Sequence, residues 1–110
     1  MSKPTIYIAA GHGGNDPGAV SGKYIEKALT LKTALACQNY LRNYECETVM
    51  ARTTDKSCTV AYKMEEVEKK RPSLVLEIHY NAGGGEVRGL LLAHARALEV
   101  TSAKKCLLKW

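Results

Sequence analysis

Phenylalanine is absent from this 110-residue sequence, and one tryptophan and six tyrosines supply all of its aromatic rings. The core must therefore come from Leu, Val, Ile, Ala, Met and Tyr. No stretch approaches the roughly 20 apolar residues that a membrane-spanning helix needs, so we expect no membrane span. The opening residues MSKPTIYIAAGHGG contain no apolar run with the length and flanks of a signal peptide. We therefore expect synthesis in the cytoplasm without a signal peptide.

The cysteines form no C-x-x-C pair, and their spacings match no zinc-finger or disulfide framework. They are Cys37, Cys46, Cys58 and Cys106. Cys37 and Cys106 fall in expected helices, where a free cysteine usually behaves as a small hydrophobic residue. We expect reduced structural thiols.

The chain is basic, with a formal net charge of +5 and a pI near 9.1. Such a charge attracts polyanions of any kind. The Lys and Arg residues are scattered, however, and aromatic residues are not interleaved with them as a nucleic-acid platform requires. We therefore expect a solvated basic surface and no nucleic-acid partner.

Strand-like and helix-like segments alternate along the chain, which is typical of an α/β layer architecture with a largely parallel sheet. No repeat, low-complexity tract or linker divides it, so we expect a single domain over residues 1–110. The expected strands are Thr5–Ala10, Glu47–Arg52, Ser73–Tyr80 and Gly89–Ala95. The expected Gly-rich loops are Gly11–Gly22 and Ala82–Arg88.

Helical periodicity predicts two helices between these strands. The first runs from Ile25 to about Asn43, with an apolar stripe of Ala28, Leu31, Leu35 and Leu41. The second is capped by Asp55 or Ser57 and ends at Pro72. Its expected stripe consists of Val60, Met64 and Val67.

Two histidines lie where expected strands end. His12 follows the first strand, and His79 lies near the end of the central one. In open α/β sheets ligands gather at the carboxyl ends of the strands, so both imidazoles can face one crevice. Glu26 opens the first helix after the loop from His12 and can return to the same edge. Two His and one Glu with an open fourth position compose a catalytic zinc site, which suits amide hydrolysis.

These residues also have simpler interpretations. A histidine after a glycine is common in turns, and Glu26 beside Lys27 is typical of a solvated helix start. Spacing alone therefore leaves the zinc site open. His94 lies in an expected strand away from the other two histidines, and we interpret it as structural or exposed. A nucleotide-binding loop is excluded, because Pro17 stands where a P-loop needs glycine.

Four segments in this order resemble the zinc-dependent N-acetylmuramoyl-L-alanine amidases of type 3, which cleave peptidoglycan. They are IYIAAGHGGNDPGAV, IEKALTL, the stretch Arg52–Asp55, and EIHYNA. The resemblance implies a three-layer, phosphorylase/hydrolase-like α/β fold with a mostly parallel sheet flanked by helices. It implies Zn²⁺ ligands at His12, Glu26 and His79, and hydrolysis of the amide between N-acetylmuramic acid and L-alanine. Asn81 matches a family asparagine, either as a substrate contact or as a turn-stabilising amide.

Three residues depart from the family's usual pattern. Ala9 stands where Asp is common, Lys63 where Arg is typical, and Glu77 replaces a small residue. Strand alternation puts Glu77 on the same face as His79, about 7 Å away along the strand. Glu77 can therefore orient an imidazole, or it can be a buried acid paired with a Lys. Both interpretations stay open.

Members of the family continue through further strands, the last of which carries a Glu that serves as general acid/base. The resemblance thus implies that this Glu lies beyond Trp110, in a C-terminal part of the domain that this chain lacks. The catalytic acid/base is therefore unknown, with Glu77 as the candidate substitute. General acid–base help is worth about 100- to 10,000-fold, so we expect weak turnover. The alternative function is an impaired module that binds zinc and cell wall, or a partner, without efficient turnover.

A missing C-terminal part would also uncover a strand edge and apolar surface. A last helix, capped by Thr101 or Ser102, would carry an apolar stripe that ends at Trp110 and has nothing to pack against. Uncovered edges template pairing with another chain, which favours a homo-oligomer. The protein would act on the cell wall after release from the cell, as a bacterial or phage endolysin does.

Overall fold

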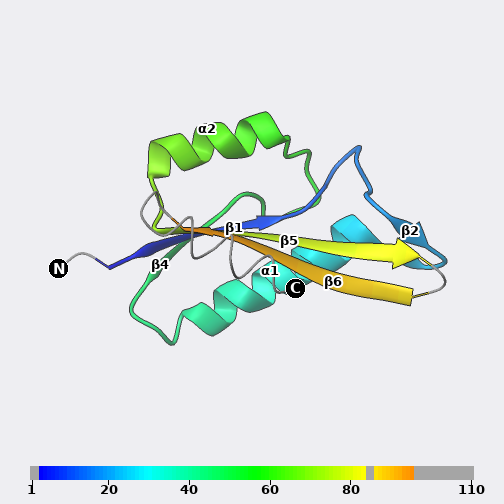
Figure 1. The fold of residues 1–110 in the computed structure, drawn as a ribbon, viewed down its shortest axis with the longest axis horizontal. Coiled ribbons are helices and arrows are strands. Elements are labelled where there is room, and N and C mark those ends of the chain that lie inside the picture. Colours follow the sequence, from blue (N-terminus) through cyan, green and yellow to red (C-terminus); the bar gives the residue numbers. More distant parts are fainter. Residues whose placement is uncertain (1–2, 84–85, 96–110) are drawn as a thin grey trace.

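A four-stranded sheet lies between two helices in the computed structural model, which describes the backbone of residues 3–83 and 86–95 and the side chains of residues 3–80 (Figure 1). The sheet strands are β1 (Thr5–Ala10), β4 (Glu47–Met50), β5 (Leu74–Gly83) and β6 (Glu86–Ala95), and a small hairpin contains β2 (Val20–Ser21) and β3 (Tyr24–Ile25). The helices are α1 (Glu26–Leu41) and α2 (Val60–Lys70).

The sheet has the order β4-β1-β5-β6. Strands β4, β1 and β5 are parallel, and β6 pairs antiparallel with β5. Figure 1 shows α2 on one face of the sheet and α1 on the other. The predicted three-layer α/β fold with a mostly parallel sheet is therefore confirmed. In the described part of the chain β4 and β6 are the outermost strands, and self-association through a sheet edge stays a prediction.

The core is centred on β1, because this strand is paired on both sides and covered by a helix on each face. Tyr7 and Ala9 pack on the α2 side of the sheet, with Val67 of α2 against them. Ile8 and Ala10 pack on the other side against Ala34 of α1. The two-residue alternation of the strand thus supplies both layers of the core.

The buried face of α1 differs from the predicted stripe. Leu31 and Leu41 pack against the core, but Ala28 and Leu35 are exposed. The fully or nearly buried residues of this helix are Glu26, Thr30 and Ala34. Two of these three are polar and have specific partners at the site described below. An apolar stripe therefore does not mark the face by which α1 meets the sheet.

The start of α2 also differs from the prediction. Its cap is Thr59, whose side chain accepts a hydrogen bond from the backbone N–H of Tyr62 at 3.1 Å. Asp55 and Ser57 do not cap the helix. Val67 packs on the core, whereas Val60 and Met64 are 68% and 65% exposed. The predicted stripe is therefore correct only at its last residue.

The Gly-rich segment after the central strand was expected to be a loop, and most of it is paired. Strands β5 and β6 continue their register to the pair Gly83 and Glu86. The predicted loop Ala82–Arg88 was therefore wrong, because backbone pairing in a hairpin does not need apolar side chains. The predicted strand Gly89–Ala95 is confirmed as part of β6.

Three further expectations concern the cysteines, a membrane span and the last helix. The cysteines of the described part, Cys37, Cys46 and Cys58, are free thiols, as predicted. Neither described helix is long and apolar enough to cross a membrane. The expected last helix, with its apolar stripe ending at Trp110, lies outside the described residues.

Candidate metal centre

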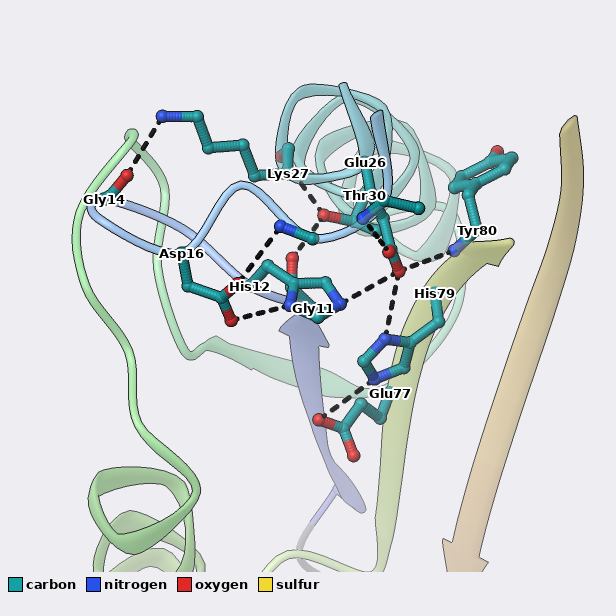
Figure 2. A network of polar contacts seen from close by, with 12 residues as sticks. Gly11, His12, Gly14, Asp16, Glu26, Lys27, Thr30, Glu77, His79 and Tyr80 are labelled. Atoms are coloured by element: carbon teal, nitrogen blue, oxygen red, sulfur yellow. Dashed lines mark hydrogen bonds and ion pairs between the residues drawn. The ribbon is translucent and has the colours of Figure 1, made fainter. Parts of the chain in front are cut away.

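Three side chains from three different elements converge at the carboxyl edge of the sheet (Figure 2). His12 follows β1, Glu26 is the first residue of α1, and His79 lies in β5. One ligand atom from each of them lies within 4.8 Å of the others. The structure therefore brings together the three residues that the sequence indicated.

Glu26 is the centre of this group and is only 5% exposed. Its Oε2 atom lies 3.1 Å from His12 Nε2 and 3.2 Å from His79 Nδ1. The backbone N–H groups of Ala19 and Tyr80 donate to its two oxygens at 2.9 and 3.0 Å. Burial opposes ionisation, but these two donors and His12 outweigh it and keep the pKa of Glu26 below its ordinary value. The carboxylate is therefore ionised and fixed in place.

His12 is held by the loop that follows β1. Its backbone has a left-handed φ of 64°, which is uncommon for a residue with a side chain. Its Nδ1 atom lies 2.7 Å from Asp16 Oδ2, so Nε2 faces Glu26. The hydrogen bond to His12, with one from the Gly18 N–H, keeps the pKa of Asp16 low. Asp16 thus orients the ring from its outer side.

His79 lies between two carboxylates. Its Nδ1 atom faces Glu26, and its Nε2 atom lies 3.4 Å from Glu77 Oε1. That same Glu77 oxygen accepts a hydrogen bond from Lys63 Nζ of α2 at 2.8 Å. Burial would raise the pKa of Glu77, but Lys63 and then His79 lower it below the ordinary value. Glu77 therefore contacts both His79 and a lysine, and its role in orienting the ring stays a prediction.

Two glycines provide the space in which these groups meet. A Cβ atom on Gly11 would lie 2.6 Å from His79 Cε1 and 2.7 Å from its Nδ1. A Cβ atom on Gly18, whose φ is +70°, would lie 2.6 Å from His12 Cδ2 and 2.7 Å from Glu26 Oε1. The bare backbone at these two positions lets both rings approach Glu26. The site is thus shaped around the three ligand atoms.

Two imidazole nitrogens and one carboxylate oxygen form a donor set that suits zinc. Three protein ligands leave a coordination position for water or substrate, as in catalytic zinc sites. Each imidazole also has a carboxylate at its outer nitrogen, the arrangement that orients histidine ligands in metalloproteins. The residues present therefore fit a zinc ion.

A buried arginine supports the backbone behind this site, and sequence reasoning did not identify it. Arg52 is 1% exposed and donates to the backbone carbonyls of Gly11, Lys27 and Thr54 at 3.1, 2.9 and 3.1 Å. Thr30 Oγ1 donates to the same Gly11 carbonyl at 2.7 Å. These contacts tie the end of β1 to the first turn of α1, the two places that carry His12 and Glu26. Only the resemblance in the stretch Arg52–Asp55 pointed to this residue.

The other candidate residues lie in β5 and β6 or beyond them. Asn81 pairs in register with Arg88, and its side chain lies outside the described part, so substrate contact stays a prediction. His94 is opposite Val75, near the beginning of β5 and away from His79. The general acid/base that the resemblance places beyond Trp110 also falls outside the described residues, which end at residue 95, and it stays a prediction.

Comparison with known proteins agrees with this geometry. The model of a protein family described as N-acetylmuramoyl-L-alanine amidase matches residues 6–105. The chain belongs to this family. CwlM of Bacillus licheniformis, described as an N-acetylmuramoyl-L-alanine amidase, is 39% identical over 82 residues, which cover 73% of this chain and 32% of that protein. The chain spans about a third of the length of the first curated amidases that it matches.

Solved structures share the fold. Cwp6 from Clostridium difficile superposes with a TM-score of 0.73 at 41% identity, covering 77% of this chain and 14% of that chain. The catalytic domain of CwlV, an N-acetylmuramoyl-L-alanine amidase from Bacillus (Paenibacillus) polymyxa, superposes with a TM-score of 0.69 at 31% identity. That match covers 76% of this chain and 48% of the CwlV chain. The α/β fold of the amidase family therefore extends over the described sheet and helices.

Proposed function

We propose that this chain is a zinc-dependent N-acetylmuramoyl-L-alanine amidase that hydrolyses the amide between N-acetylmuramic acid and L-alanine in peptidoglycan. The ligands are His12 Nε2, Glu26 Oε2 and His79 Nδ1. The observation that carries the proposal is the convergence of these atoms from β1, α1 and β5 in a member of the amidase family.

When bound, the zinc ion supplies Lewis acidity, which lowers the pKa of a water ligand and polarises the amide carbonyl. The chain's own residues prepare the site for it. Glu26 contributes the negative charge, and the N–H groups of Ala19 and Tyr80 stop its carboxylate from rotating. Asp16 and Glu77 occupy the outer nitrogens of the rings, which leaves the inner nitrogens for the metal.

We do not assign to Glu77 the role of the acid/base that protonates the leaving amine. Figure 2 shows Glu77 and Glu26 at different nitrogens of the His79 ring. The ring therefore separates Glu77 from the proposed metal position, and Lys63 already holds its nearer oxygen. This geometry supports a role in orienting His79 over the role of proton donor that the sequence suggested.

Metal removal tests the proposal directly. Protein purified without chelator is expected to contain close to one zinc per chain and to release stem peptides with a free N-terminal L-alanine slowly from purified peptidoglycan. Chelator treatment should abolish the release, and added zinc should restore it. Release that survives complete metal removal would disprove the zinc mechanism. Zinc binding and wall binding without any release would instead support the impaired binding module.

The space at Gly11 gives a second test. Gly11→Ala places a methyl group against the His79 ring and the Ile78 carbonyl, 2.7 Å away. We expect zinc affinity to fall by about 10- to 100-fold, the range seen when residues around a metal ligand are altered. Gly22→Ala is the matched control, because no atom lies within 4 Å of the added Cβ. Its φ of +57° makes it cost some stability, but its zinc affinity should match that of the unaltered chain.

A further inference from the structure

We propose that Glu77 and Lys63 form a positioning pair that prepares His79 to bind metal. In this pair the Glu77 carboxylate lies 3.4 Å from His79 Nε2, the nitrogen that must keep the proton of the ring once Nδ1 binds metal, and Lys63 holds the carboxylate in place. The role in zinc binding rests on the proposed function. The contact between Glu77 and the ring does not, because it exists in the protein itself.

The contacts form one chain from α2 to the ligand atom. Lys63 Nζ lies 2.8 Å from Glu77 Oε1, and the same oxygen lies 3.4 Å from His79 Nε2. His79 Nδ1 is then 3.2 Å from Glu26 Oε2. A neutral imidazole carries its proton on one nitrogen and a lone pair on the other. Both nitrogens of His79 face a carboxylate, Glu26 at Nδ1 and Glu77 at Nε2, so the charge of Glu77 raises the share of the form in which Nδ1 can bind a cation.

Stability alone is a poor explanation for this pair. The side chains of Lys63 and Glu77 are only 11% and 26% exposed. Removing two charges from water costs about as much as their attraction returns, so a buried ion pair often adds little net stability. An acid at position 77 is better explained by its second contact, the one to His79.

The three departures from the family's usual residues meet at this place. Ala9 of β1 is the register partner of Glu77 of β5, and Lys63 of α2 contacts Glu77. All three line a cavity of about 450 Å³ between α2 and the sheet. The carboxylate common at position 9 is missing here, and a carboxylate stands one strand away. In this chain the acid beside the basic residue of α2 therefore lies in β5 and not in β1.

A comparison with His12 explains why the acid beside His79 lies in a strand and not in a loop. His12 offers Nε2 to the site and has Asp16 of its own loop at Nδ1. His79 offers the other ring nitrogen, Nδ1, so its outer nitrogen points back along the sheet. An acid two residues earlier in β5 lies on the same face and meets it there.

The first experiment measures zinc affinity against a competing chelator in the full chain. Glu77→Gln keeps the shape of the side chain, and we expect zinc affinity to fall by about 10-fold or more. Glu77→Ser should cause a larger loss, and adding Ala9→Asp to it should recover most of the affinity. Glu65→Gln is the matched control, because Glu65 pairs with Lys69 on the exposed face of α2, and it should leave affinity unchanged.

The second experiment needs no metal. In metal-free protein at alkaline pH, imidazole ¹⁵N spectra should show a share of His79 protonated at Nε2, and Glu77→Gln should reduce this share while the protonation of His12 stays unchanged. Unchanged His79 spectra together with unchanged zinc affinity in Glu77→Gln, with only thermal stability reduced, would overturn the proposal and leave a structural ion pair. A chain that binds no zinc but shows the expected spectra would refute the proposed function and leave the positioning pair supported.

Discussion

Replacement of Glu26 by Gln is expected to lower zinc affinity by more than about 100-fold, beyond the range found for residues that only support a ligand. The substitution removes the negative charge to which both rings are directed at 3.1 and 3.2 Å. The amide keeps the shape of the side chain, and its oxygen can still accept one of the two backbone N–H groups that the carboxylate holds. The other N–H loses its acceptor at a cost of about 1–3 kcal/mol, which is below the stability of a domain of this size. We therefore expect the variant to fold, and the loss of metal to reflect the loss of the ligand.

Metal content and a zinc titration check this result. Glu45→Gln is the matched control, since Glu45 is exposed in the turn before β4 and should leave the affinity unaltered. The double variant His12→Ala, His79→Ala completes the series and should contain no stoichiometric zinc. A full complement of zinc in either ligand variant would show that the metal binds elsewhere.

The convergence of His12, Glu26 and His79 was predictable because topology decides where strand ends meet. Parallel strands bring their carboxyl ends to one edge, so residues after β1 and near the end of β5 were expected at the same place. Asp16 could not be predicted as the partner of His12. That contact depends on the left-handed backbone of His12 and on the bridge between Gly13 and Asp16, which no periodicity indicates.

Helix faces were less predictable than strands. The side of α1 that meets the sheet edge is built on Glu26 and Thr30, which are buried because they have partners there. A prediction from apolar periodicity does not identify such a polar face. It therefore assigned Leu35 to the core, and Leu35 is instead exposed. The cap of α2 was misplaced for a related reason. Asp55 is occupied by the Gly14 N–H and Lys27, which leaves Thr59 to begin the helix.

Arg52 shows the limit of sequence reasoning most clearly. An arginine at the end of an expected strand is normally taken as exposed, because arginine is rarely buried without partners. Its partners here are backbone carbonyls from distant segments, and a carbonyl's direction is set only once β1 and α1 are in place. This role leads to the second prediction with a large expected effect.

Arg52→Met is expected to lower the free energy of unfolding by about 3–6 kcal/mol, because it removes buried hydrogen bonds from a charged donor to the carbonyls of Lys27 and Thr54. Methionine fills much of the same volume but donates nothing, so the carbonyls of Lys27 and Thr54 lose their donor from Arg52. Each buried hydrogen bond to a charged group is worth about 1.5–3 kcal/mol. A domain of this size is stable by only about 5–15 kcal/mol, so the loss is a large share.

Urea denaturation of the metal-free protein measures this effect. Arg42→Met is the control, because Arg42 is exposed after α1 and should change stability by less than about 0.5 kcal/mol. Arg52→Lys separates charge from geometry: a lysine keeps the charge but cannot reach several carbonyls in the planar pattern of a guanidinium, so it should recover only part of the loss. Equal stabilities for the Arg52→Met and Arg42→Met variants would show that Arg52 does not hold the strand end and helix start together. The positions of His12 and Glu26 would then be maintained by their other contacts, including Asp16 at His12 and the N–H groups of Ala19 and Tyr80 at Glu26.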